Sequence, residues 1–152
     1  MIPRKKKINS CSWLIPIEQA VKLKSIGYDK PCLFYSEGDE TNFELNKSIS
    51  EDCCNVSLTD VNLKNYNESA WLISLPDWHS VFDWFREKGL KFDLQTTITY
   101  KGTTYCFYVH SSRVEDWWTN NVDYESYTNC QIALLDELIE RYRERGKDEE
   151  KE

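Results

Sequence analysis

The chain has 152 residues, of which 40% are hydrophobic, so it is long enough to bury a core without disulfides or metal ions. Its net charge is −7, with basic residues gathered near the start, and an acidic body disfavours nonspecific binding to nucleic acid. The apolar runs are far shorter than the ~20 residues of a membrane-spanning helix, and no signal peptide is recognisable. These features predict a globular protein in a reducing cytoplasm.

The six cysteines and two histidines do not form a recognisable metal or disulfide framework. No Cys-x-x-Cys spacing occurs, and the adjacent pair Cys53-Cys54 suits neither a disulfide nor a zinc site. We therefore expect no metal ion, no cofactor and reduced thiols.

Composition divides the chain into an arm, a body and a tail. Residues 1–10, which contain Arg4 and three lysines, are predicted to be a flexible basic arm, and residues 147–152 a charged tail. Residues 11–146 are predicted to be a single α+β domain. Within it, residues 36–69 form an irregular acidic excursion, because a polar segment of this length is uncommon in a compact domain.

A short helix and several short strands are predicted before the central helix. The helix covers residues 17–26 and ends at Gly27, with an inward face made of Ile17, Ala20, Val21 and Leu23. Strands are expected at residues 31–35, 43–45, 55–58 and 70–73.

The central helix is predicted over residues 77–88. Ser74 is the expected N-cap, because Ser74 and Asp77 have the spacing of a capping box, and Pro76 suits a first turn. Gly89 is the expected left-handed residue after the last turn. The apolar stripe consists of Trp78, Val81, Phe82 and Phe85.

A hairpin is predicted directly after this helix. Its first strand, residues 91–100, alternates polar residues with an expected buried set, and Lys101-Gly102 forms the turn. The return strand, residues 104–110, is apolar or aromatic on both faces, which is typical of a central strand. The expected buried set of the first strand is Phe92, Leu94, Ile98 and Tyr100.

A third strand and a long helix complete the chain. The strand is predicted within residues 114–119, and the helix over 127–145, starting near Ser126 or Thr128 and closing at Gly146. Its expected inward stripe is Ile132, Leu135, Ile139 and Tyr142, with Ala133 and Leu138 beside it. The fold class is therefore α+β: a small antiparallel sheet of three or more strands, two main helices on one face, and a short N-terminal helix.

Three segments carry a resemblance to a protein group. They are EQAVKLKSIGYDKPCLFYS, SLPDWHSVFDWFREKGL with the paired strands after it, and YESYTNCQIALLDELIERY. They resemble small proteins encoded by phages, prophages and mobile elements of Bacteroidota, over about two-thirds of the chain. The matching positions are Lys24 to Tyr28, Pro31-Cys32, Pro76 to Leu90 and Ser126 to Ala133, although Asn129 and Cys130 replace the acidic residues that are usual there. The resemblance implies a bacterial cytoplasm as the setting. It implies no catalytic residue, because the group has no established activity.

The sequence offers little support for catalysis. His79 and His110 are isolated, and the carboxylate pairs are adjacent residues whose side chains point in different directions, so a solvated surface is the simpler interpretation. No nucleophile elbow or phosphate loop occurs. An enzyme with an unrecognised carboxylate site is kept as a second alternative.

The order helix–strand–strand–strand–helix from Ser74 to Arg145 is the order of double-stranded-RNA-binding domains. Those domains use basic residues at the start of the last helix, whereas residues 127–131 contain none. Nucleic-acid binding is therefore the first alternative rather than the expected function.

The favoured function is noncatalytic binding of a host or phage protein, with inhibition of a host function as one form of it. The candidate contact residues are Trp117, Trp118, Tyr124 and Tyr127. Adjacent tryptophans on a strand point to opposite faces, so both cannot be buried under the same helices. We nevertheless favour a core role for this pair over an exposed one.

Overall fold

The computed structural model describes residues 13–36, 63–111 and 115–151, together with the backbone of 43–45. The predicted arm, most of the 36–69 excursion, the strand at 55–58 and three cysteines, Cys11, Cys53 and Cys54, lie outside these residues. The chain forms two compact units, Met1–Val81 and Phe82–Glu152. The prediction of a single domain is not tested by this division.

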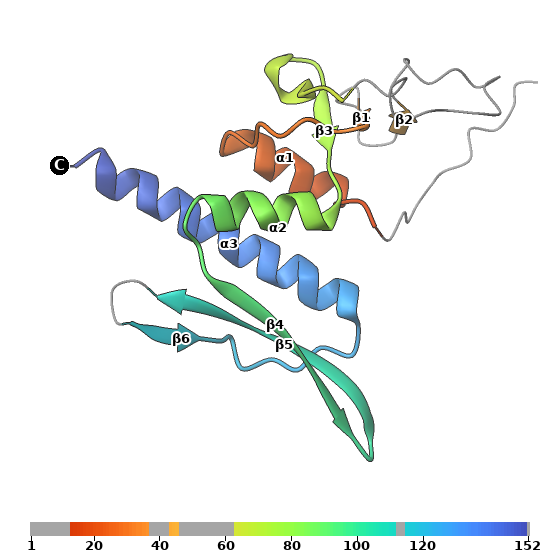
Figure 1. Cartoon of the computed structure of the whole chain (residues 1–152), viewed down its shortest axis with the longest axis vertical. Helices are drawn as coiled ribbons and strands as arrows, with labels where there is room; N and C mark the ends of the chain where they lie inside the picture. Colours follow the sequence, from red (N-terminus) through yellow and green to blue (C-terminus); the bar gives the residue numbers. More distant parts are fainter. Residues whose placement is uncertain (1–12, 37–42, 46–62, 112–114, 152) are drawn as a thin grey trace, which may run out of the picture. The chain divides into compact units, whose positions relative to one another are not determined.

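The α+β class is confirmed, with one more sheet than predicted. The described residues form three α-helices and two antiparallel sheets, whose strand orders are β2-β1-β3 and β4-β5-β6. These elements are labelled in Figure 1. The second sheet arises because the segment after α1 (Ile17–Ser25) forms a sheet of its own rather than joining the hairpin.

The first unit places α1 on a small sheet. Strand β1 (Phe34–Ser36) pairs with β2 (Phe43–Leu45) on one side and with β3 (Ile73–Leu75) on the other. Helix α1 packs against β3, and a short 3₁₀ helix, η1 (Tyr66–Glu68), precedes β3. The predicted strands at 31–35 and 70–73 are therefore displaced toward the C-terminus by a few residues.

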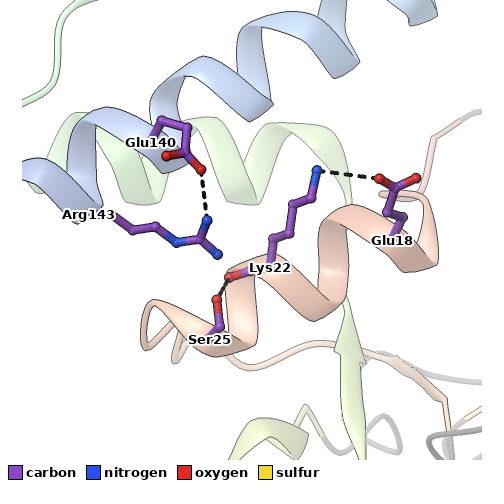
Figure 2. Close-up of polar contacts among 5 residues, drawn as sticks. All are labelled: Glu18, Lys22, Ser25, Glu140 and Arg143. Carbon is purple, nitrogen blue, oxygen red and sulfur yellow. Dashed lines mark hydrogen bonds and ion pairs between the residues drawn. The ribbon is translucent and has the colours of Figure 1, made fainter.

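Helix α1 ends as predicted, and its buried face differs from the prediction at one residue. Gly27 has a φ of +87°, which glycine adopts without strain. Ala20 and Leu23 are buried, but the expectation for Val21 is wrong: it is exposed, and Gln19 is buried instead. Figure 2 shows the polar contacts of this helix, an ion pair between Glu18 and Lys22 at 3.4 Å and a Ser25 hydroxyl that donates to the Lys22 carbonyl.

The side chain of Lys24 ties α1 to the loop before β3. Its Nζ donates to the carbonyl oxygens of Ser69 and Leu72, each at 2.6 Å. Because these carbonyls belong to irregular backbone, the ammonium group satisfies acceptors that no strand or helix satisfies. A helix-surface lysine thereby acquires a structural role.

Helix α2 (Trp78–Glu87) begins later than Ser74 predicts. Ser74 lies in β3, where its Oγ accepts a hydrogen bond from the buried backbone N–H of Tyr66 at 3.0 Å. Asp77 is the cap instead: its Oδ1 accepts from the Ser80 backbone N–H at 2.9 Å. Pro76 consequently precedes the helix, and its carbonyl accepts from the Ile15 N–H.

The C-terminal end of α2 agrees with the prediction. Gly89 has a φ of +83°, and its N–H donates to the Arg86 carbonyl at 2.9 Å. Arg145 from the final helix donates to the carbonyl of Lys88 at 2.6 Å, which satisfies another acceptor at this end. Trp84, which the predicted stripe omits, is buried and lies 5.1 Å from the ring of Tyr142.

The second unit is the predicted hairpin with a third strand and a long helix. Strands β4 (Phe92–Thr99) and β5 (Gly102–Ser111) pair from Phe92↔Val109 to Thr99↔Gly102, so the turn consists of Tyr100-Lys101 and not Lys101-Gly102. Strand β5 is central, as predicted, because β6 (Asp116–Trp118) pairs with its other side.

Helix α3 (Tyr127–Glu149) covers one face of this sheet. The Ser126 hydroxyl accepts from the Asn129 N–H at 3.3 Å, which makes Ser126 the N-cap. The helix continues through Gly146, so the predicted end there is wrong. Its buried residues are Cys130, Gln131, Leu134, Leu135, Leu138 and Ile139.

Helix α2 covers the same face of the sheet in its Phe82–Glu87 part. The rings of Phe82 and Phe92 lie 5.4 Å apart, and the Arg86 guanidinium lies 4.8 Å from the Phe92 ring. Phe107 and Val109 are buried on this inner face, so the two main helices lie on one face, as predicted. The expected burial of Ile98 and Tyr100 is wrong: both are exposed at the far end of the hairpin.

Candidate interaction surface

Strand β6 forms one edge of the β4-β5-β6 sheet and carries both candidate tryptophans. Trp118 lies opposite Val109 of β5, and Trp117 lies opposite His110. Directly opposed residues in an antiparallel pair share a face, so Trp118 is on the inner face with Val109 and Trp117 is on the outer face. The prediction that the two rings occupy opposite faces is confirmed.

Trp118 lies at the border of the region that α3 covers. The guanidinium of Arg141 is 5.1 Å from its ring, and the ring of Phe107 is 6.3 Å away. Arg141 is held by Glu137, whose Oε1 accepts from Nε at 2.7 Å. The indole still exposes 40% of its surface, so Arg141 covers one side of the ring and leaves the remainder available.

Trp117 lies against the ring of His110. His110 lies 5.3 Å from it at an interplanar angle of 74°, an edge-to-face arrangement. Its exposed fraction is 50%. The expectation that this pair belongs to the core is therefore wrong, because the three-residue strand lies at the sheet edge beyond full cover from α3.

Tyr124 has a mainly structural position. Its backbone exchanges two hydrogen bonds of 2.8 Å with Tyr105, and its ring stacks on Phe107 at 6.5 Å. Asn120 donates to its hydroxyl at 2.8 Å. Tyr124 thus fixes the segment that joins β6 to α3 against the side of β5.

Tyr127, the first residue of α3, is more exposed. Its ring meets Tyr105 edge to face at 5.3 Å, and 48% of its surface remains accessible. The rings of Tyr124 and Trp118 both lie beside the ring of Phe107. The ring of Tyr127 lies beside that of Tyr105, which is on the same inner face. Hereafter, the β6 aromatic surface denotes Trp117, Trp118, Tyr124 and Tyr127.

The residues around the β6 aromatic surface are mainly acidic. Glu115, Asp116 and Asp123 are exposed beside β6 and the loop after it. The neighbouring Cys106 side chain, with smaller contributions from burial and Asp123, raises the pKa of Tyr108 above its usual 10.0.

Two residues of this region were not predicted from the sequence. His110 supports Trp117, and Arg141 covers Trp118, but nothing in the sequence pairs either residue with a tryptophan. The position of His110 follows only from the strand register, and that of Arg141 from the packing of α3 on the sheet. The roles of His110 and Arg141 can be recognised only once the β5–β6 register and the packing of α3 on the sheet are known.

The described residues contain no cluster of metal-ligating side chains. Among them, no group of three or more His, Cys, Asp or Glu side chains lies close enough to hold a metal ion. Glu115 and Asp116 are exposed, whereas Asp136 and Glu137 on α3 are half-buried and Glu137 binds Arg141. His79 is exposed on α2.

The three cysteines within the described ranges are free thiols. Burial, and to a smaller extent the neighbouring Cys106, raises the pKa of Cys130 to about 11. Burial likewise raises the pKa of Cys32, against opposing hydrogen bonds from Ser74 and nearby backbone. Since the thiolate is the reactive form, these two side chains are poor nucleophiles at neutral pH.

The comparisons with known proteins give no family assignment. No protein-family model matches the chain, no curated protein matches it, and no solved structure matches it. In the described part of the chain, no helix combines the length and apolar character needed to cross a bilayer.

Proposed function

We propose that this protein is a noncatalytic binding protein that uses the β6 aromatic surface to hold a partner protein. The observation that carries the proposal is the exposure of Trp117 and Trp118, which a sheet-edge strand presents on two faces. The resemblance to phage- and prophage-encoded proteins supports a bacterial cytoplasm as the setting and a host or phage protein as the partner. Inhibition of a host function is one form that such binding takes.

The chemistry of the surface supports a protein partner. Large aromatic side chains dominate binding energy because they bury much area with few rotatable bonds, and tryptophan is enriched at interface hot spots. Arg141 and His110 hold the two indoles in defined positions, so little side-chain freedom is lost on binding. The acidic residues nearby favour a partner whose contacting rim is basic.

The test is affinity capture of the tagged chain from a Bacteroidota lysate, with and without nuclease, for the wild type and for Trp117→Ala and Trp118→Ala. We expect one protein to be retained after nuclease treatment and to be lost with either variant. Trp71→Ala is the matched control, because Trp71 is 81% exposed and lies in the first unit. The control should retain the partner.

The variants must remain folded for the result to be informative. Since both indoles are about half exposed, we expect either substitution to move the unfolding midpoint by only a few degrees. Capture that Trp117→Ala and Trp118→Ala leave unchanged, in folded protein, would contradict the proposed surface. A collapse of the fold would instead show that the half-exposed indoles are required for stability.

Nucleic-acid binding is kept as the alternative because the order α2-β4-β5-β6-α3 is observed. The first turn of α3 contributes no lysine or arginine, and this weakens the nucleic-acid alternative. This alternative predicts retention that is lost with nuclease, falls steeply with salt, and requires residues 1–7. The enzyme alternative has no assembled group of residues to support it in the described part of the chain.

A further inference from the structure

The opposite edge of the same sheet, strand β4, is long and exposed. Its residues from Gln95 to Thr99 are all exposed, and Ile98 has 81% of its surface accessible. The strand pairs with β5 along its whole length and with no other described strand. One side of its backbone is therefore a row of hydrogen-bonding groups without a strand partner within the described residues.

The register shows which backbone groups point outward. The His110 N–H donates to the Lys91 carbonyl, so Lys91 belongs to a hydrogen-bonded pair of the β4–β5 ladder. Hydrogen-bonded and non-hydrogen-bonded positions alternate along an antiparallel pair. The backbone groups of Leu94, Thr96 and Ile98 consequently point away from β5, toward the open edge.

Strand β4 lacks the devices that protect the other edges. Exposed edges are usually short, bulged, or marked by lysine or proline. Strand β6 has three residues, with Glu115 at a φ of 49° just before it, and β2 and β3 have three residues each. Strand β4 has eight residues in unbroken register, no proline and no lysine.

Local charge does not oppose pairing of two copies along this strand, although their net charges repel each other at longer range. The chain carries a net charge of −7, yet the run Leu94 to Tyr100 contains no charged residue. Two identical acidic proteins can therefore approach along this strand without placing like charges opposite each other. A basic or acidic foreign strand would gain no electrostatic complementarity from this edge.

We propose that two copies of the chain pair through β4, antiparallel and about a two-fold axis at Thr96. This register places Leu94 of one copy opposite Ile98 of the second copy, and Thr96 opposite itself. The outward backbone groups of these three residues then bond to one another across the axis. The β4-β5-β6 sheets of the two copies then become one continuous sheet.

Other registers fit the observed strand less well. An axis at Thr97 would place Tyr100 and Lys101, which form the turn, opposite Leu94 and Asp93. An axis between two residues would oppose side chains from different faces of the sheet. The axis at Thr96 uses residues 93–99 alone and covers the exposed side chain of Ile98 with Leu94.

The experiment is sedimentation velocity of the full chain as Thr96→Lys, as Thr96→Glu, and as an equal mixture of the two. On the axis each variant places like charges opposite each other, so we expect each alone to be monomeric. The mixture places Lys opposite Glu, so it should recover the dimer that the wild type forms. Thr103→Lys, an exposed position on the central strand β5, is the control and should remain dimeric.

Three results would overturn the proposal. The first is a wild type that stays monomeric up to about 0.5 mM. The second is dimerisation of Thr96→Lys equal to that of the wild type. The third is a mixture that stays monomeric although both variants are folded by circular dichroism. Each result is independent of whether the β6 aromatic surface binds a partner.

Discussion

At the base of the β4–β5 hairpin Phe107 and Val109 are buried, whereas near its tip Ile98 and Tyr100 expose 81% and 94% of their surface. Both ends have the two-residue periodicity of a β-strand, and the two strands are paired in continuous register from base to tip. The difference lies in what covers the inner face, because α3 and the end of α2 pack on the base. Strand periodicity thus determines pairing, and helix position determines which part of the strand belongs to the core.

The largest expected effect comes from removing a ring at the base. Phe107→Ala deletes a buried side chain that contacts the rings of Trp118 and Tyr124, so we expect a loss of ~3–5 kcal/mol in the free energy of unfolding. Urea denaturation would measure it. A loss below ~1 kcal/mol would mean that the base is as loosely packed as the tip.

A smaller effect is expected from the thiol that α3 buries over this sheet. Burial raises the pKa of Cys130 from its usual 9.0 to about 11 in the folded chain. Because the folded value is raised, the stabilisation is complete below pH 9 and is lost as pH rises toward 11. Unfolding midpoints across this range should fall, and Cys130→Ala should reduce the slope. An unchanged slope would show that other groups cause the alkaline loss.

The smallest effect is expected at the tip. Ile98→Thr keeps a β-branched residue in the strand and removes only exposed apolar surface, so stability should change by less than ~0.5 kcal/mol. The measurement is urea denaturation at low protein concentration, where association does not contribute. A loss comparable with that of Phe107→Ala would place Ile98 in the core and remove the contrast.

The start of α2 shows where local sequence rules reach their limit. Ser74 and Asp77 both have cap-forming side chains, and the spacing alone favoured Ser74. The hydroxyl of Ser74 is instead occupied by the Tyr66 N–H, a contact that depends on the path of the chain before β3. Helix α2 and the β4–β5 hairpin were predictable because each has a strong period, whereas this boundary depended on a tertiary contact.

The candidate surface was predictable to a similar degree. Adjacent tryptophans on a strand must face in opposite directions, and this was confirmed for Trp117 and Trp118. Their exposure was not predictable, because it depends on how far α3 extends over β6 and on the position of Arg141. The sequence therefore located the residues, and the packing of a distant helix decided their availability.

Strands β4 and β6 are opposite edges of one sheet, and this arrangement has a consequence for avidity. A pair of chains joined through β4 would present one β6 aromatic surface at each end of the shared sheet. Once one end is bound to an oligomeric or filamentous target, the other end meets the next site at a high effective concentration. Modest affinity at each tryptophan pair would then be sufficient for long residence on a repetitive partner.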